Sequence, residues 1–319
     1  LPMFLLSGCA NVLFHEQDRL AMGGKYAEIA GTPQTEKTTK AESVSPNNAG
    51  LAGKCLAYSK LKTYDKLFSC IEQMESNIAK GDTIIEHHGL FSWNYPENIV
   101  AMPGLLRAEA LIDFGEYDKS ASLSRAIHES LPGIEWTSKD TRNSWQRRFR
   151  IRALGLLSLA MALKGERERA EQSISELATI EASAYEFWLT PGGVSTAIAK
   201  EKRFVLARAH MALGNYDKVI EDPPDFWEAF GALSEGLLGY SLFAYIDFPK
   251  AFMKSKALYE TGKINEAKSG YDRLLSQPES RSNGEIYWQI LHDRGRIAEA
   301  EGQVEAAIGF YRQAIDVIE

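Results

Sequence analysis

Residues 262–267 read Gly-Lys-Ile-Asn-Glu-Ala, and residues 302–307 read Gly-Gln-Val-Glu-Ala-Ala. Each stretch follows a segment in which apolar residues recur at helical spacing, and each begins another such segment. A glycine ends the first helix because the turn needs a residue that tolerates the left-handed conformation. The small residue further on lets the second helix approach the first closely. Each stretch therefore predicts two antiparallel helices joined by a tight turn.

The same pattern recurs along the chain. Near copies read Thr-Tyr-Asp-Lys at 63–66, Glu-Tyr-Asp-Lys at 116–119 and Asn-Tyr-Asp-Lys at 215–218, and looser copies occupy 24–28 and 165–170. The turn markers after the first lie about 40 to 53 residues apart and are Lys62, Gly115, Gly165, Gly214, Gly262 and Gly302. Seven copies in one chain predict an array of helical hairpins.

These residues resemble the tetratricopeptide repeat (TPR), a helical hairpin of about 34 residues. The resemblance covers residues 54–319 and implies an all-α fold, a superhelical array of antiparallel helical hairpins. The repeats are degenerate, because their spacing is wider than in the family. The extra residues fall in aromatic segments between the pairs, at 92–96, 131–136 and 188–193. No sustained alternation of polar and apolar residues occurs, so we expect no sheet.

The start of the chain indicates a membrane anchor. Residues 6–9 read Leu-Ser-Gly-Cys after an apolar run and resemble the lipobox of bacterial lipoproteins, which implies that Cys9 carries acyl chains. Ala10 rather than Asp follows, which in that family implies the outer membrane and a protein facing the periplasm. The alternative is a stray cysteine in a short buried helix. The expected regions are an anchor at 1–9, a helical segment at 10–30 and a flexible linker at 31–53, which is rich in Thr, Ser, Pro, Asn, Lys and Glu and has few apolar residues.

The composition is that of a soluble globular protein, with 45% hydrophobic residues and a net charge of −7. That charge, with no long basic run, excludes nucleic acid as a partner. The apolar stretch 226–246 is long enough to span a membrane, but Glu228 and Glu235 favour a buried central helix instead. We therefore expect membrane contact only through the lipid anchor.

The cysteine count favours one disulfide. If Cys9 is lipidated, only Cys55 and Cys70 remain, and an even remainder in an exported protein favours a bond. Cys55 lies about two turns before the hairpin turn at Lys62, and Cys70 lies about two turns after it. Antiparallel helices would bring both to the same height. The alternative is two buried free thiols.

The sequence contains no familiar motif for catalysis, metal binding or cofactor binding. Of the six histidines only His87 and His88 are adjacent, and no His-Glu-x-x-His or Cys-x-x-Cys spacing is present for zinc. Nucleophile-elbow, Walker and Rossmann motifs are also missing. We therefore expect a protein that is not an enzyme and holds no metal or cofactor.

One basic concentration falls at residues 142–152. Its arginines alternate with aromatic residues, a composition typical of interface hot spots. We expect a binding site for a carboxylate or an acidic peptide there; its candidate residues are Arg147, Arg148, Arg152, Trp145 and Phe149. The alternative is a set of arginines that only pair with acidic residues of neighbouring helices.

These features together favour a membrane-tethered periplasmic scaffold that binds a protein or peptide on its concave surface. Two alternatives remain open. In the first alternative the array serves as a regulatory arm, for example of a CHAT-type peptidase. The reason is that the helix expected at 306–319 keeps its apolar face through Ile315 and Ile318. In the other it carries a small molecule; the aromatic segments would then form the site around Trp93, Trp136, Trp188 and Trp227.

Overall fold

A computed structural model describes residues 20–22, 24–31, 47–88, 94–132, 144–183, 187–189, 195–222, 230, 233 and 242–318. Within these ranges the chain is all-α apart from four short strands. The helices are α3 (Tyr26–Gly31), α4 (Asn47–Lys60), α5 (Tyr64–Ala79), α6 (Met102–Asp113), α7 (Tyr117–Ser130), α8 (Ser144–Lys164), α9 (Arg167–Thr179), α10 (Ile198–Ala212), α11 (Tyr216–Ile220), α13 (Ala244–Glu260), α14 (Ile264–Leu275), α15 (Pro278–Ser282), α16 (Gly284–Ala300) and α17 (Val304–Ile318).

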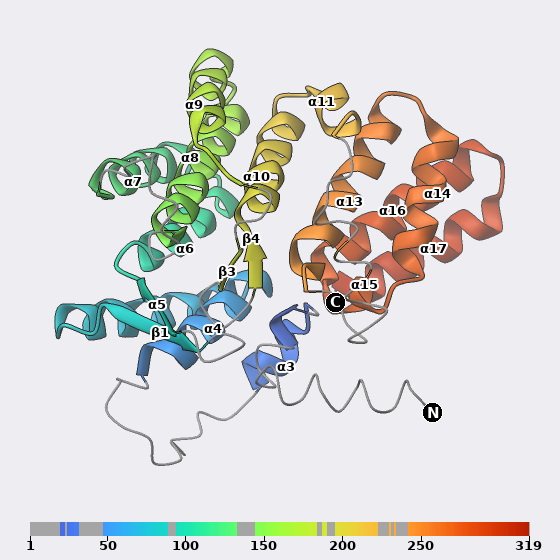
Figure 1. Ribbon diagram of the computed structural model, residues 1–319. Helices are drawn as coiled ribbons and strands as arrows, with labels where there is room; N and C mark the ends of the chain where they lie inside the picture. The colour runs from blue at the N-terminus through green and yellow to red at the C-terminus, as the bar shows by residue number, and fades with distance from the viewer. Residues whose placement is uncertain are drawn as a thin grey trace.

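The helices pack as successive pairs, which Figure 1 shows side by side. We call α4, α6, α8, α10, α13 and α16 the first helices, and their partners α5, α7, α9, α11, α14 and α17 the second helices. The turn within each pair has the same backbone. At Gly115, for example, the glycine N–H donates to the carbonyl of Ile112 at 3.0 Å, and the next N–H, of Glu116, donates to Leu111 at 2.9 Å. These two hydrogen bonds together form the Schellman motif, which the repeated glycines predicted.

The turn motif requires a left-handed residue, and the chain supplies one each time. Positive φ angles occur at the six turn glycines Gly24, Gly115, Gly165, Gly214, Gly262 and Gly302. Lys62, with φ of 55°, takes the same position and is the only other residue with positive φ in the described part, glycines aside. The residue five positions after the turn is buried in every pair; Ala170, Ala267 and Ala307 are at most 4% exposed. The close helix approach predicted from these small residues is therefore present.

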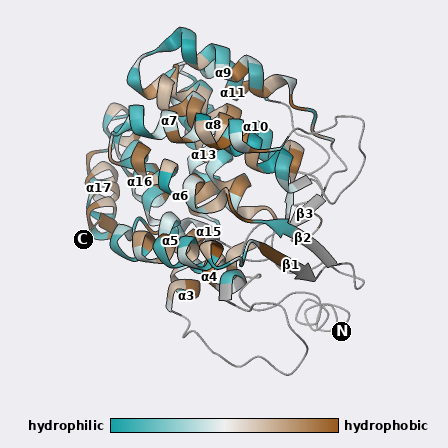
Figure 2. Cartoon of the chain, turned by 90° about the vertical axis from the view of Figure 1, so that its left-hand side faces the viewer, coloured by the Kyte–Doolittle hydropathy of each residue, from teal (hydrophilic) through white to brown (hydrophobic). Residues whose placement is uncertain are grey.

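Two β-hairpins interrupt the helices, so the expectation of no sheet is wrong at these places. Strand β1 (Ile84–His88) pairs antiparallel with β2 (Asn94–Asn98), and β3 (Phe187–Leu189) pairs with β4 (Ser195–Ala197). The first three strands lie on one side of the molecule and α17 on the other (Figure 2). With three to five residues each, these strands are too short to show a clear alternating pattern, and β2 and β3 overlap the aromatic segments between pairs.

The expected linker at 31–53 ends earlier than its composition indicated, because α4 begins at Asn47. Asn48 is 1% exposed and donates to the Asp82 carbonyl at 2.8 Å, while Asn77 donates to the Asn48 side chain at 3.0 Å. Leu51 is buried beside them. Asn48, one of the polar residues that predicted a linker, is therefore buried with hydrogen-bond partners, which composition alone does not reveal.

Helix α3 joins parts of the molecule that are distant in sequence. It packs on α4 (Figure 1), and its Tyr26 belongs to a buried cluster that also contains Ala57 of α4 and Phe243 at the start of α13. Lys62 also reaches α16, with its Nζ 3.5 Å from the Glu285 carboxylate. The array is therefore curled, so that its early and late pairs meet around α3.

Two further expectations concern apolar surfaces. Most of the apolar stretch 226–246 lies outside the described residues, and no described helix is long and apolar enough to cross a membrane. Helix α17 keeps the exposed apolar face expected of it; Ile308, Ile315 and Ile318 are 44%, 53% and 63% exposed.

Candidate functional site

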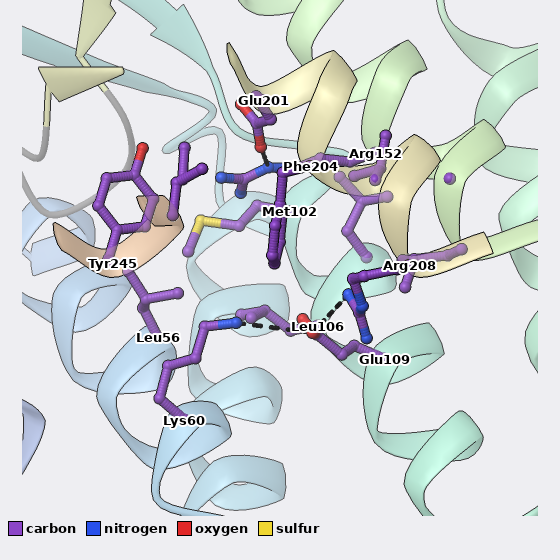
Figure 3. Close-up of a pocket in the computed structure, with 15 residues that line it drawn as sticks. Leu56, Lys60, Met102, Leu106, Glu109, Arg152, Glu201, Phe204, Arg208 and Tyr245 are labelled. Carbon is purple, nitrogen blue, oxygen red and sulfur yellow. Dashed lines mark hydrogen bonds and ion pairs between the residues drawn. The ribbon is translucent and has the colours of Figure 1, made fainter. Parts of the chain in front are cut away.

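A pocket lies inside the curl, and every described residue that lines it comes from a first helix. Its walls are formed by α4, α6, α8, α10 and the beginning of α13 (Figure 3). The lining residues are Leu56, Lys60, Met102, Leu105, Leu106, Glu109, Arg152, Gly155, Leu156, Glu201, Phe204, Val205, Arg208, Tyr245 and Ile246. The second helices contribute none of these, so the pocket belongs to one surface of the array.

Close helix packing shapes one wall. A Cβ added to Gly155 on α8 would lie 2.6 Å from the Cβ of Val205 on α10, which is nearer than side-chain atoms approach one another. Only a glycine therefore permits this spacing of α8 and α10. The spacing sets Arg152 and Glu201, one on each helix, at the edge of the same pocket.

One end of the pocket, the Glu109 end, holds two cations on one carboxylate. Lys60 Nζ lies 3.6 Å and Arg208 Nη1 lies 3.2 Å from the same oxygen, Glu109 Oε1 (Figure 3). Burial alone would raise the pKa of Glu109, but the charges of Lys60, Arg208 and two further cations outweigh burial and hold that pKa well below its usual range. Glu109 is therefore a carboxylate that stays ionised.

Lys60 itself is in an unusually cationic setting. The charge of Glu109 raises the pKa of Lys60, but burial and the charges of Arg208, Lys62 and Arg152 together leave that pKa below its usual value.

Tyr26 of α3 is 4% exposed, and burial, with the charge of Glu109, raises the pKa of its hydroxyl.

The opposite end, the Glu201 end, is formed by Arg152, Glu201 and Tyr245. Arg152 Nε donates to Glu201 Oε1, and Glu201 is 4% exposed. Burial lowers the pKa of Arg152, but the charge and hydrogen bond of Glu201 outweigh it and raise that pKa overall. Burial also raises the pKa of Tyr245, so its hydroxyl stays protonated. Between the two ends the pocket is apolar, with Leu106, Phe204 and Met102 facing it (Figure 3).

Two residues of the binding site expected at 142–152 are enclosed rather than exposed to a partner. Arg148 and Phe149 are both 0% exposed, which leaves them no access to a partner, so this part of the prediction is wrong. Arg148 forms an ion pair with Glu97 of β2, and its guanidinium stacks 4.7 Å from the Phe149 ring centre. The alternative, arginines paired with acidic residues of neighbouring elements, describes Arg148 correctly. A guanidinium without access to water needs such a partner.

The other members of that expected site are divided. Trp145 is half-buried and packs edge-on against Phe149 with ring centres 5.9 Å apart, and Arg147 is half-buried on the same helix. Arg152 alone lines the pocket. Lys60, Glu109 and Arg208 were not predicted from the sequence as residues of a binding site. These three belong to different first helices, and no local motif marks them; only the repeat pattern, which identifies first helices, pointed to their surface.

The disulfide between Cys55 and Cys70 is present as predicted, with Sγ atoms 2.11 Å apart. It joins α4 to α5 one residue from Leu56 of the pocket wall. The predicted lipidation site Cys9 and the aromatic residues Trp93, Trp136 and Trp227 lie outside the described residues. The backbone of Trp188 falls in β3.

Among the described residues, no three His, Cys, Asp or Glu side chains are placed to hold a metal ion. The described pocket wall contains no histidine, cysteine, serine or threonine, and both of its carboxylates already contact cations.

Comparisons with family models, with curated proteins and with solved structures find no match for this chain.

Proposed function

We propose that the protein is a TPR-like scaffold, tethered to the outer membrane through Cys9, that binds a partner polypeptide in the periplasm on its inner surface. The observation that carries this proposal is the origin of the pocket wall: every lining residue that the structure describes lies on a first helix. In stacked helical repeats the equivalent helices of successive units form one continuous surface, and such surfaces bind extended partners. The repeated turn motif supports the same reading of the array.

A crosslinking experiment tests the inner surface. A photo-crosslinking amino acid in place of Phe204, on first helix α10, is expected to give a discrete adduct with a partner in intact cells. The same amino acid in place of Glu171, exposed on second helix α9, provides the matched control and is expected to give none. No adduct at Phe204, or equal adducts at both positions, would remove the inner surface as the binding face.

The anchor is tested separately. The chain expressed behind a complete lipoprotein signal sequence should fractionate with outer membranes, and Cys9→Ser should release it to the soluble periplasmic fraction because no acyl chain is attached. Ala10→Asp is the control, since it keeps the lipidation but should move the protein to the inner membrane. A Cys9→Ser protein that stays with membranes would refute the anchor.

The pocket also favours a second candidate function, the binding of a small molecule. Its apolar middle lies between two polar ends, and ligand sites commonly combine an apolar wall with a few placed polar groups.

A further inference from the structure

The charges of the pocket wall do not balance. Among the described residues of the wall, three are cations, Lys60, Arg152 and Arg208, and two are carboxylates, Glu109 and Glu201. Arg152 and Glu201 form one pair, so Glu109 is left to serve both Lys60 and Arg208 through a single oxygen. The pocket wall therefore has one positive charge in surplus, and that charge is at the Glu109 end.

Two neighbouring carboxylates outside the wall already form ion pairs with another cation, Lys62. Lys62, two residues beyond Lys60, contacts Asp113 at 2.7 Å and Glu285 at 3.5 Å. Lys60 and Arg208 are 31% and 25% exposed, so both are partly removed from water but reachable. A cation in this position gains when an anion enters beside it, because attraction between charges strengthens as water is excluded.

The Glu201 end is unsuited to an anion. Arg152 is already neutralised there, and Glu201 Oε2 accepts no hydrogen bond from any described residue although it is buried. This oxygen would repel a negative group and would accept a hydrogen bond from a donor. A ligand with one anionic group must therefore place it at the Glu109 end. Its remaining body then lies against the apolar middle of the pocket, at Leu106 and Phe204 (Figure 3).

We propose that this pocket binds a small amphiphilic organic anion, with a carboxylate or similar head between Lys60 and Arg208 and an apolar body against Leu106 and Phe204. The proposal rests on the small-molecule candidate function and is independent of the polypeptide scaffold. It names the ligand class from two features together, the surplus positive charge at one end and the apolar wall beyond it.

Titration calorimetry with three probes of equal chain length tests the charge of the head. The full chain carrying Cys9→Ser is titrated with hexanoate, 1-hexanol and hexylammonium, so that no detergent competes for the pocket. Hexanoate is expected to bind at least ten-fold more tightly than 1-hexanol, and hexylammonium to bind most weakly. Equal affinity for hexanoate and 1-hexanol, or tighter binding of hexylammonium, would overturn the proposal.

Substitutions then locate the head. Lys60→Met keeps the length of the side chain without its charge and is expected to weaken hexanoate binding about ten-fold while leaving 1-hexanol binding unchanged. Arg208→Gln provides a second variant with the same expectation. Lys54→Met, on the same helix as Lys60 but outside the pocket wall, is the matched control and should bind hexanoate normally. Unchanged hexanoate affinity in both Lys60→Met and Arg208→Gln would overturn the proposal.

Two failures can be told apart. If none of the three probes binds, the small-molecule candidate function falls together with this proposal. If 1-hexanol or hexylammonium binds at least as tightly as hexanoate, and Phe204→Ala weakens that binding, the pocket takes small molecules but the anionic head is refuted. Crosslinking from Phe204 to a partner polypeptide is unaffected by either result and tests the scaffold alone.

Discussion

Individual charged residues inside this protein are held by partners distant in the chain. Arg148 of α8 meets Glu97 of β2, and both side chains are 0% exposed. A buried ion pair adds little net stability, but the loss of one member leaves the other as an uncompensated buried charge. The contribution of such a residue therefore depends on its partner more than on its own type.

Arg148→Met should lower the free energy of unfolding by about 3–5 kcal/mol, because the Glu97 carboxylate is then buried without the guanidinium that neutralises it. Urea unfolding at pH 7 measures the change. The double variant Glu97→Gln with Arg148→Met should recover much of the loss, and Arg125→Met at an exposed position of α7 should have little effect. A cost of Arg148→Met as small as that of Arg125→Met would show that Arg148 is not buried as described.

Glu109 should make stability depend on acidity. The pKa of this carboxyl is lower in the folded protein than its ordinary value of 4.5, because the charges of Lys60, Arg208 and other cations outweigh burial. Its stabilisation is therefore complete above pH 4.5 and is lost as the pH falls through more acidic values. Urea midpoints measured from pH 6 to pH 3 should fall less steeply for Glu109→Gln than for the unchanged protein. Glu72→Gln, at an exposed position, should leave the slope unchanged.

At the scale of the elements, the helix pairs depend on one repeated turn. Gly262 has φ of +79°, and a Cβ there would meet no atom within 4 Å, so an alanine is opposed by its backbone conformation alone. Gly309 lies within α17, also with no atom within 4 Å of an added Cβ, but with ordinary helical backbone. The two glycines separate the demand of the turn from the general cost of glycine.

Gly262→Ala should destabilise the protein by about 1–2 kcal/mol, since a left-handed conformation costs an L-residue roughly that much. Gly309→Ala should instead stabilise it by about 0.5–1 kcal/mol, because alanine loses less conformational freedom than glycine in a helix. Thermal unfolding followed by circular dichroism measures both. Changes of the same sign in the two variants would contradict the role assigned to the turn.

At the scale of the whole molecule, α3 connects the early and late pairs. Tyr26 is 4% exposed in a cluster with Ala57 and Phe243, which are 31 and 217 residues further along the chain. The curl that encloses the pocket is therefore stabilised by packing of the first described segments of the chain against its middle and later parts.

Tyr26→Ala should destabilise the protein by roughly 3–5 kcal/mol, as truncation of large buried aromatic side chains does. Hydrogen exchange is the more specific measurement. Amides near Ala57 and near Phe243 should lose protection together, while those of α17 should keep theirs. Loss of protection confined to α3 would mean that the curl holds without it.

Features that depend on near neighbours in the chain could be predicted from the sequence. The helix pairs follow from residues such as Gly262 and Ala267, since a left-handed turn and a small residue five positions on are local requirements. The bond between Cys55 and Cys70 follows from equal distances to one such turn. The short hairpins were not predicted because three to five residues carry too little pattern. The start of α4 was not predicted because its polar Asn48 is buried with hydrogen-bond partners.

Which charged residues are buried, and which meet in the pocket, could be seen only in the tertiary structure. Arg148 and Arg152 look alike in sequence, yet one is enclosed with Glu97 and the other borders the pocket with Glu201. Glu109 and Arg208 are 99 residues apart, and their contact depends on how several helix pairs stack. Burial and ion pairing are set by what surrounds a side chain in space, and those surroundings come from helices whose relative positions no local pattern records.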